Sequence, residues 1–337
     1  MSIDINKKID NILNSPDPII RHINTNHLID EENSKESDIS MTIKEIHSKL
    51  EKAGYISSPT IDYAVSGCII DNVPLVIEGA PGVGKTELAK ATAKMLNLPL
   101  YRVQFYEGLT YDKILYDYNY QKQLLTIQAI KGCLDEHLKD LSVEEAVKKV
   151  EDIPIFGKDF ILERPVLKSI NGEGRCVLLL DEIDKSSEEI EYTLLQFLDE
   201  FAITIPQYGT VTCPENMKPI VFLTSNNYRE LSNALRRRCN YLYIEPKTKA
   251  EMEKILVAKA KIDPNLAQQV ANCLDKIKGL PLKQTPSISE AITWARHIDQ
   301  NFKENPNEIE NTIYMIAKNN SDRIAISSSG IIKNIFS

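Results

Sequence analysis

The most constraining feature of this chain is a glycine-rich stretch that fits the pattern GxxxxGK[ST], Gly79-Ala80-Pro81-Gly82-Val83-Gly84-Lys85-Thr86. It lies between an apolar run at residues 73–78, typical of a buried parallel strand, and residues 85–96, whose apolar positions have helical spacing. Glycines allow backbone conformations in which successive N–H groups point at a phosphate, and the N-terminus of the helix adds a favourable dipole. The sequence therefore predicts a phosphate-binding loop in a parallel α/β sheet.

Two residues of this loop have specific predicted roles. Lys85 is expected to reach the β- and γ-phosphates of a nucleoside triphosphate, and the Thr86 hydroxyl is expected to bind Mg²⁺. The alternative is a glycine-rich turn with a solvated lysine, which the complete pattern between a strand and a helix disfavours. The remaining predicted nucleotide-binding residues are Gly79, Ala80, Pro81, Gly82, Val83, Gly84 and Glu87.

A second apolar run, residues 176–180, ends in the acids Asp181 and Glu182. Ligands of parallel α/β sheets bind at the carboxyl ends of the strands, so both acids are expected on the side of the γ-phosphate. Asp181 is predicted to hold the same Mg²⁺ ion as Thr86, usually through water, and Glu182 to orient and polarise an attacking water. Alternatively, the two acids only cap the following helix. Activation of water indicates hydrolysis of the nucleotide.

Two more segments follow in the order that such a site requires. Residues 219–225 predict another buried strand, after which Asn226 could hydrogen-bond the attacking water or the γ-phosphate; a simple turn former is the alternative. Residues 230–239 predict a short helix that ends in Arg236, Arg237 and Arg238. One arginine would suffice to complement the helix dipole, and an arginine delivered to the γ-phosphate of a neighbouring subunit can raise the rate by ~10³–10⁵.

Composition limits the class of protein. A chain of 337 residues with 42% hydrophobic and 26% charged residues can form one large core and one smaller core. Its net charge of −8 and the lack of a basic-aromatic stretch disfavour nucleic acid as a partner. The six cysteines have neither zinc-ligand nor disulfide-framework spacing, which indicates a reducing compartment. Without a signal-like segment or a run of ~20 apolar residues, we expect a cytoplasmic protein with no membrane insertion.

The predicted domains follow from these patterns. Residues 1–41, with the acidic, polar stretch 30–40, are expected to form a flexible extension, and residues 42–245 the α/β domain. Residues 246–318 are expected to be all helical, with Trp294 in their core, and residues 319–337, rich in Asn and Ser, to be an irregular tail. The helical segments are predicted at 249–260, 264–277, 289–302 and 308–317, the third capped by Ser287 or Ser289 with Glu290.

In this order, the four motifs resemble those of AAA+ ATPases over about residues 42 to 318, and the segments 103–105 and 164–167 resemble the MoxR branch. The resemblance implies a P-loop NTPase with a doubly wound parallel sheet and a helical lid domain. The long interval between Lys85 and Asp181 is similar to the family's helix-2 insertion, at about 110–170, with residues 157–163 in an inserted hairpin. The alternating β-branched residues of 201–214 predict a hairpin before the third motif, which matches the family.

The resemblance also implies roles for single residues. Asn226 corresponds to sensor 1, Arg238 is the first candidate for the arginine finger and Arg237 is the second. Many members carry a sensor-2 arginine at the start of the third lid helix, where this chain has residues 285–290 without an arginine; Arg296 lies about two turns further along.

The function that the resemblance implies is Mg²⁺-dependent hydrolysis of ATP to ADP in a homo-oligomeric ring, expected to be a hexamer. Such a ring would remodel or activate a client protein, chaperone-like, beside a partner with a von Willebrand factor A domain. Two alternatives stay open: a nucleic-acid motor of the restriction or helicase type, and a nucleotide-regulated binding module. The acidic net charge disfavours the first, and Glu182 together with the arginines disfavours the second.

Overall fold

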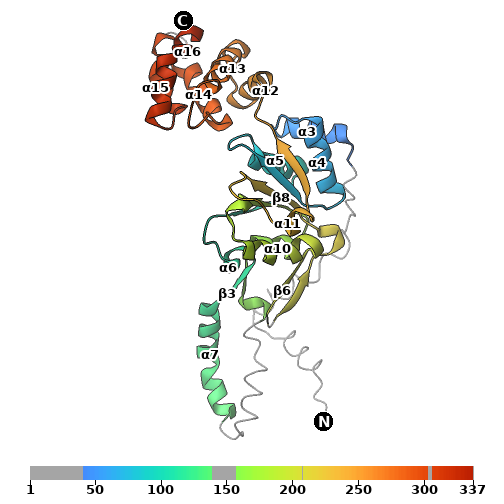
Figure 1. The fold of residues 1–337 in the computed structure, drawn as a ribbon. Helices are drawn as coiled ribbons and strands as arrows, with labels where there is room; N and C mark the ends of the chain where they lie inside the picture. Colours follow the sequence, from blue (N-terminus) through green and yellow to red (C-terminus); the bar gives the residue numbers. More distant parts are fainter. Residues whose placement is uncertain (1–40, 139–156, 207, 303–305, 337) are drawn as a thin grey trace, which may run out of the picture. The chain divides into compact units, whose positions relative to one another are not determined.

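The computed structural model describes residues 41–138, 157–206, 208–302 and 306–336 (Figure 1). The predicted N-terminal extension, residues 1–41, lies outside this range except for Met41. A parallel sheet with flanking helices comes first in the chain, and a helical region follows it. Within the described residues, no helix combines the length and apolar character needed to cross a bilayer.

Five parallel strands form the central sheet of the described chain, in the order β2-β5-β8-β1-β9. The three inner strands are buried along their whole length, as expected where helices cover both faces of a parallel sheet. The predicted α/β class is therefore confirmed. The strands are β1 (Leu75–Gly79), β2 (Leu100–Gln104), β5 (Val177–Asp181), β8 (Ile220–Ser225) and β9 (Asn240–Ile244).

Helices on both sides of the sheet fix its strands. The helix after the phosphate-binding loop, α5, begins at Lys85 and ends at Leu96, and it packs on α3, β1, β5 and β8. A capping box of Thr42 and Glu45 starts α3, in which each side chain bonds the backbone N–H of the other residue. The other α-helices of this domain outside residues 105–160 are α3 (Ile43–Lys52), α4 (Pro59–Ile70), α9 (Pro165–Asn171), α10 (Glu188–Glu200) and α11 (Asn233–Arg236).

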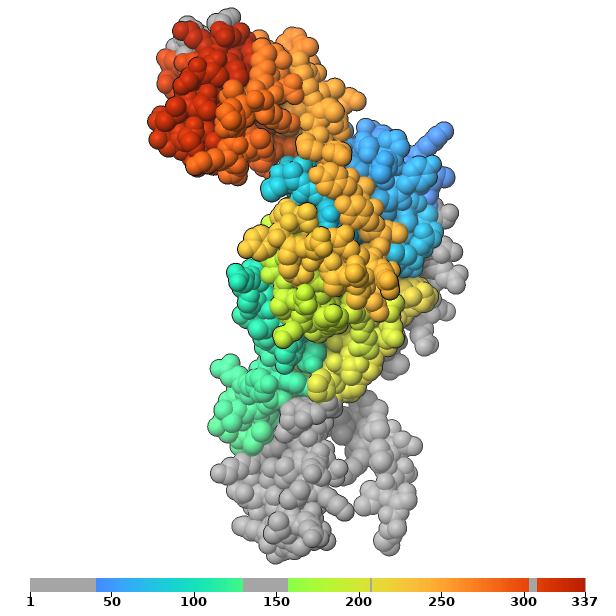
Figure 2. Space-filling model, viewed as in Figure 1, coloured from blue at the N-terminus to red at the C-terminus, as the bar shows by residue number. Residues whose placement is uncertain are grey.

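The long interval between β2 and β5 contains an inserted element. Strands β3 (Tyr116–Tyr118) and β4 (Ile161–Glu163) pair antiparallel, but they are not consecutive strands of a hairpin because the helix α7 (Tyr120–Leu138) lies between them in the sequence. Of the residues 157–163 expected in a hairpin, only 161–163 form a strand, and Lys158–Phe160 form a 3₁₀-helix, η2. The short helix α6 (Tyr111–Ile114) precedes β3, and α7 follows it. Figure 2 shows the surface of residues 120–129 of α7 in green, and Tyr120, Leu124 and Leu125 in this part are exposed. Residues 139–156 of the insertion lie outside the described range.

The hairpin predicted before the third motif is confirmed. Strands β6 (Ala202–Ile205) and β7 (Gly209–Thr212) pair antiparallel across a turn whose Gly209 has φ +113°. The inward side chains Ile203 and Ile205 are buried in the core of the sheet domain, which explains the alternating pattern.

The predicted lid helices are present with adjusted bounds. They are α12 (Lys249–Ile255), which continues as a π-helical turn η5 (Leu256–Ala260), then α13 (Pro264–Lys278) and α14 (Ile288–Asn301). The fourth segment, η6 (Pro306–Met315), is a 3₁₀-helix. Apolar spacing of three and four residues suits both helix types, so the pattern alone did not distinguish them.

Capping and core residues of this region agree with the sequence. Ser287, and not Ser289, forms the capping box with Glu290. Trp294 is fully buried, as expected, and its indole N–H donates to the Thr312 hydroxyl at 2.7 Å.

The expected irregular tail at 319–337 is wrong. Residues Asn320–Ser329 form α15 and Ile331–Phe336 form α16; Asn319 caps the first helix, and Gly330, at φ +64°, ends it. Ile326, Ile332 and Phe336 are buried in the core of the helical region, and the Phe336 ring packs edge-on against Trp294 at 6.1 Å. The Asn and Ser residues that suggested irregular structure instead form caps and the exposed faces of these helices.

Candidate functional site

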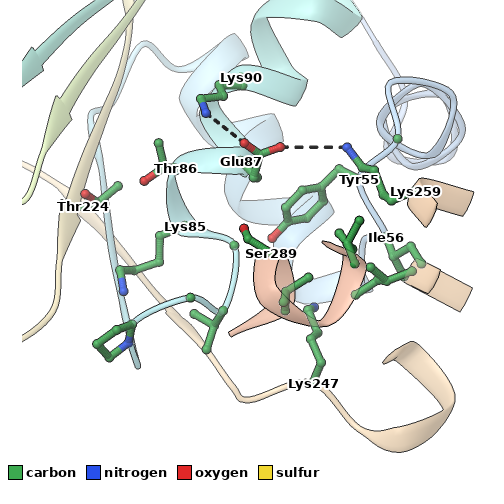
Figure 3. A pocket seen from close by; sticks show the side chains of 18 of the residues that line it. Tyr55, Ile56, Lys85, Thr86, Glu87, Lys90, Thr224, Lys247, Lys259 and Ser289 are labelled. Carbon is green, nitrogen blue, oxygen red and sulfur yellow. Dashed lines mark hydrogen bonds and ion pairs between the residues drawn. The ribbon is translucent and has the colours of Figure 1, made fainter. Parts of the chain in front are cut away.

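The carboxyl ends of β1, β5 and β8 open into a cavity of about 380 Å³, a size typical of small-molecule sites (Figure 3). Residues 81–87 and the polar ends of β5 and β8 line one part of it. A second part is lined by residues 54–56, by Lys247 and by residues of the helical region. Lys247 lies just before the helical region, and the lining residues within that region are Ile255, Lys259, Ile288, Ser289 and Ile292.

Glycines give the phosphate-binding loop its shape. Gly82 has φ +80° and Gly84 has φ +103°, conformations that other residues rarely adopt. A Cβ on Gly82 would lie 2.6 Å from the Cβ of Ser287, which is too close for any side chain. The loop can therefore keep this course only with glycine at these positions, and this explains the glycines of the motif.

Lys85 lies at the centre of the loop and is almost completely buried. Its ammonium donates to the carbonyl oxygens of Gly79 (2.7 Å) and Ala80 (3.0 Å) and to Oδ1 of Asn226 (2.7 Å). Burial lowers the pKa of the Lys85 ammonium, and nearby carboxylates, first that of Asp184, oppose this effect. The structure therefore brings together two residues that the sequence placed in one site from separate motifs.

Asp181 is held by four hydrogen bonds. Its Oδ1 accepts from the hydroxyls of Thr86 (2.9 Å) and Thr224 (2.5 Å), and its Oδ2 accepts twice from Arg102. Adjacent ligands of an octahedral Mg²⁺, each about 2.0–2.1 Å from the ion, are separated by about 2.9 Å. The Thr86 and Asp181 oxygens have that separation and are hard oxygen ligands, so the pair predicted as metal ligands fits Mg²⁺.

Glu182 lies directly after β5 in a left-handed conformation, with φ 59° and ψ 47°. Such a backbone is uncommon for a residue other than glycine and is found preferentially at functional sites. Its carboxylate accepts from Gln104 (2.9 Å), Lys185 (2.6 Å) and Nδ2 of Asn226 (3.3 Å). The Asn226 amide therefore connects Lys85 with Glu182, as a residue that contacts both the γ-phosphate and an attacking water would.

Several residues that contact this site were not singled out from the sequence, among them Arg102, Gln104, Asp184 and Thr224. Arg102 and Gln104 lie on β2, where Gln104 is in register with Asp181 of β5. Asp184, fully buried, accepts the backbone N–H groups of Asn226 (3.0 Å) and Tyr228 (2.8 Å). The alternation of polar residues along β2, and a third acid after the Asp181-Glu182 pair, are the signals that could have indicated them.

The arginine-finger candidates differ in their surroundings. Arg238 donates to the Ala234 carbonyl (3.0 Å) and pairs with Asp199 (3.2 Å), and Arg236 lies 3.6 Å from Glu78. Arg237 is exposed, and its side chain makes no hydrogen bond or ion pair within the described residues. None of the three lines the described cavity. The structure thus leaves Arg237 as the candidate whose guanidinium is not already engaged.

Two further positions that the sequence analysis considered, Glu87 and Arg296, differ in their relation to the cavity. Glu87 lines the cavity but pairs with Lys90 (2.9 Å) and lies 3.9 Å from Lys259 (Figure 3). Arg296 donates to the backbone carbonyl of Lys259 and does not line the described cavity. Two other cations line the cavity from this side: Lys247, just before α12, and Lys259, in η5. Neither is at the position expected for a sensor-2 arginine.

Comparison with known proteins agrees with this geometry. Residues 74–239 match the family model of the AAA domain of the dynein-related subfamily. The matched range begins just before β1 and contains the phosphate-binding loop, Asp181, Glu182, Asn226 and the arginines. With the five-stranded parallel sheet and the helical region that follows, the match supports an AAA+ ATPase with a P-loop and a helical lid. A search among curated proteins returns no match.

Proposed function

We propose that this protein hydrolyses ATP to ADP and phosphate at the cavity between the phosphate-binding loop and the lid. The observation that supports this most is the Asn226 side chain, which bonds Lys85 on one side and Glu182 on the other. A binding module needs the loop and Lys85 only, whereas a carboxylate held beside the γ-phosphate position serves the activation of water.

The proposed mechanism assigns one task to each group. Lys85 would exchange its bonds to loop carbonyls for the β- and γ-phosphate oxygens, and Thr86 and Asp181 are the residues that would hold Mg²⁺. The ion, when bound, neutralises charge on the phosphate oxygens. Glu182 accepts the proton of the attacking water, and Asn226 keeps that water in line with the γ-phosphate.

We further propose that the protein works as a homo-oligomeric ring, expected to be a hexamer. The arginines after α11 do not line the cavity of their own chain, so a cation for the developing charge would come from a neighbouring subunit. The exposed, unengaged side chain of Arg237 favours it as that group, with Arg238 next once its pair with Asp199 opens.

The proposed task of the ring is to remodel or activate a client protein, chaperone-like, as in the MoxR branch. Support comes from the resemblance of the sequence segments around β2 and α9 and from the insertion between β2 and β5, which contains a short antiparallel pair of strands. By the same resemblance, a protein with a von Willebrand factor A domain is the proposed partner.

The test is release of phosphate from ATP by the purified protein with Mg²⁺. The wild type should turn over with saturation, and Lys85→Ala should lose roughly 10²-fold or more of that rate, because it removes a cation from the transferring phosphate. The matched control is Lys94→Ala, which removes an exposed lysine near the other end of the same helix, α5. Nucleotide binding without any phosphate release, at all protein concentrations, would instead indicate a binding module.

A further inference from the structure

Arg102 contacts the metal-binding carboxylate of the site. It lies on β2, the edge strand beside β5, and donates Nε (3.0 Å) and Nη2 (2.5 Å) to Oδ2 of Asp181. The same guanidinium donates to Oε1 of Gln104, the next residue on that face of the strand. Arg102 is 45% exposed, whereas Asp181 is 4% exposed, so the arginine reaches a buried anion from the solvent side.

The hydrogen bonds of Asp181 are complete. A carboxylate offers about four acceptor positions, and all four are occupied: two by Arg102 on Oδ2, and two by Thr86 and Thr224 on Oδ1. A magnesium ion, with the water molecules that it retains, must use the same oxygens. Arg102 and the metal therefore cannot both satisfy Asp181 in full.

We propose that Arg102 is a displaceable counter-ion of Asp181 that competes with Mg²⁺, so that loading of the metal-bound nucleotide releases the guanidinium from the carboxylate. This inference rests on the proposed nucleotide site. Its consequence is that Arg102 offsets the repulsion between Asp181 and the phosphates when a nucleotide binds without metal. The protein should then bind metal-free ADP with appreciable affinity, and it should need a higher Mg²⁺ concentration for tight binding than it would without Arg102.

A positioning role for Arg102 predicts the opposite. If the arginine only oriented Asp181, its loss would weaken the binding of Mg²⁺. The hydroxyls of Thr86 and Thr224 hold Oδ1 independently of Arg102, and Thr224 also accepts the backbone N–H of Glu182 at 2.9 Å. The carboxylate should therefore stay in place without the guanidinium, and removal of Arg102 should free Oδ2 for the metal.

The test measures binding and not turnover. A fluorescent N-methylanthraniloyl-ADP is titrated into the protein in EDTA and at increasing Mg²⁺, for the wild type, Arg102→Gln and Arg102→Lys. For Arg102→Gln, we expect the Kd for ADP in EDTA to rise about tenfold and the Mg²⁺ concentration for half-maximal tight binding to fall about tenfold, as for the loss of a charged hydrogen bond. Arg102→Lys keeps the positive charge but cannot donate two parallel hydrogen bonds, so both of its values should lie between those of the wild type and Arg102→Gln.

The charge control is Lys185→Gln. Lys185 pairs with Glu182 (2.6 Å) and makes no hydrogen bond to Asp181, so its loss removes one positive charge from the site without freeing Oδ2. We expect the Mg²⁺ requirement of this variant to stay within about twofold of wild type.

The outcomes separate this inference from the function on which it rests. A Mg²⁺ requirement that rises or stays unchanged in Arg102→Gln would overturn the competition, and so would an equal fall in Lys185→Gln, which would indicate a general effect of charge. Failure of the wild type to bind the fluorescent ADP, with or without Mg²⁺, would refute the nucleotide site itself, and this is measured before any variant.

Discussion

Asp184 offers a sharp test of how the site is held together. Its side chain is fully buried, and its Oδ2 accepts the backbone N–H groups of Asn226 and Tyr228 at 3.0 and 2.8 Å. Asp184→Ala removes the acceptor of both part-buried donors, and each such loss costs about 1–3 kcal/mol. The free energy of unfolding of the sheet domain should therefore fall by about 2–6 kcal/mol. Asp184→Asn keeps an acceptor oxygen and should cost less than about 1 kcal/mol.

The same change should affect turnover more than binding. Without its anchor, Asn226 no longer holds a fixed position between Lys85 and Glu182. We expect the kcat of Asp184→Ala to fall at least about tenfold, as for displaced positioning groups, with a smaller change in KM.

The assay is urea unfolding followed by two signals. Far-UV circular dichroism reports on the whole chain, whereas the single tryptophan, Trp294, lies in the core of the helical region. The matched control is Asp199→Ala, which removes an exposed acid paired with Arg238 and should cost no more than about 1 kcal/mol. The reasoning is refuted if Asp184→Ala unfolds like Asp199→Ala, or if the Asn variant is as unstable as the Ala variant.

Three other predictions concern the ring, the C-terminal helices and the thiols. Arg237→Ala alone should hydrolyse ATP slowly, and mixing it with Lys85→Ala should restore part of the activity because some sites of a mixed ring then have both residues intact. The same mixture with Arg238→Ala shows which of the two arginines acts. If neither mixture regains activity although the rings assemble, the arginine finger is a different residue. Phe336→Ala should destabilise the helical region by about 3–5 kcal/mol and shift the emission of Trp294 to the red, measured by fluorescence during urea unfolding, whereas an unchanged transition would detach α16 from this core. Burial raises the pKa of four cysteines to about 12, so only about one of these thiols in 10⁴ is ionised at pH 8. Their alkylation, measured by peptide mass spectrometry, should therefore be slow until urea unfolds the chain. Rapid labelling of the folded protein would contradict the burial. These cysteines are Cys68, Cys176, Cys239 and Cys273.

Much of the site could be predicted because its motifs are local. The phosphate-binding loop needs glycines at fixed spacing, and Asp181, Glu182 and Asn226 each follow a strand that is recognisable as a continuous apolar run. Parallel strands bring their carboxyl ends to one edge, so the meeting of Lys85 with Asn226 follows from the order of motifs alone.

The contacts that were missed depend on pairing between distant segments. Arg102 contacts Asp181 only because β2 lies beside β5 in a particular register, and neither strand indicates the other in the sequence. Asp184 bonds backbone groups, which leave no pattern of side chains to recognise. Which arginine after α11 is engaged within the chain likewise depends on Asp199, a residue on another helix.

The C-terminal helices were missed for a different reason. Composition suggested an irregular tail, but few apolar residues suffice where each one is buried, as Ile326, Ile332 and Phe336 are. The polar residues between them cap the helices or face the solvent, which composition cannot distinguish from a loop.

The most direct test of the account compares binding and turnover in Glu182→Gln. The amide keeps the size of the side chain and loses the base, so the variant should bind ATP with a Kd near that of the wild type. Its steady-state release of phosphate should fall by about 10²–10⁴-fold, the usual contribution of a general base. Release at the rate of the wild type by a variant that binds ATP normally would contradict the assignment of Glu182, and with it the proposed mechanism of hydrolysis.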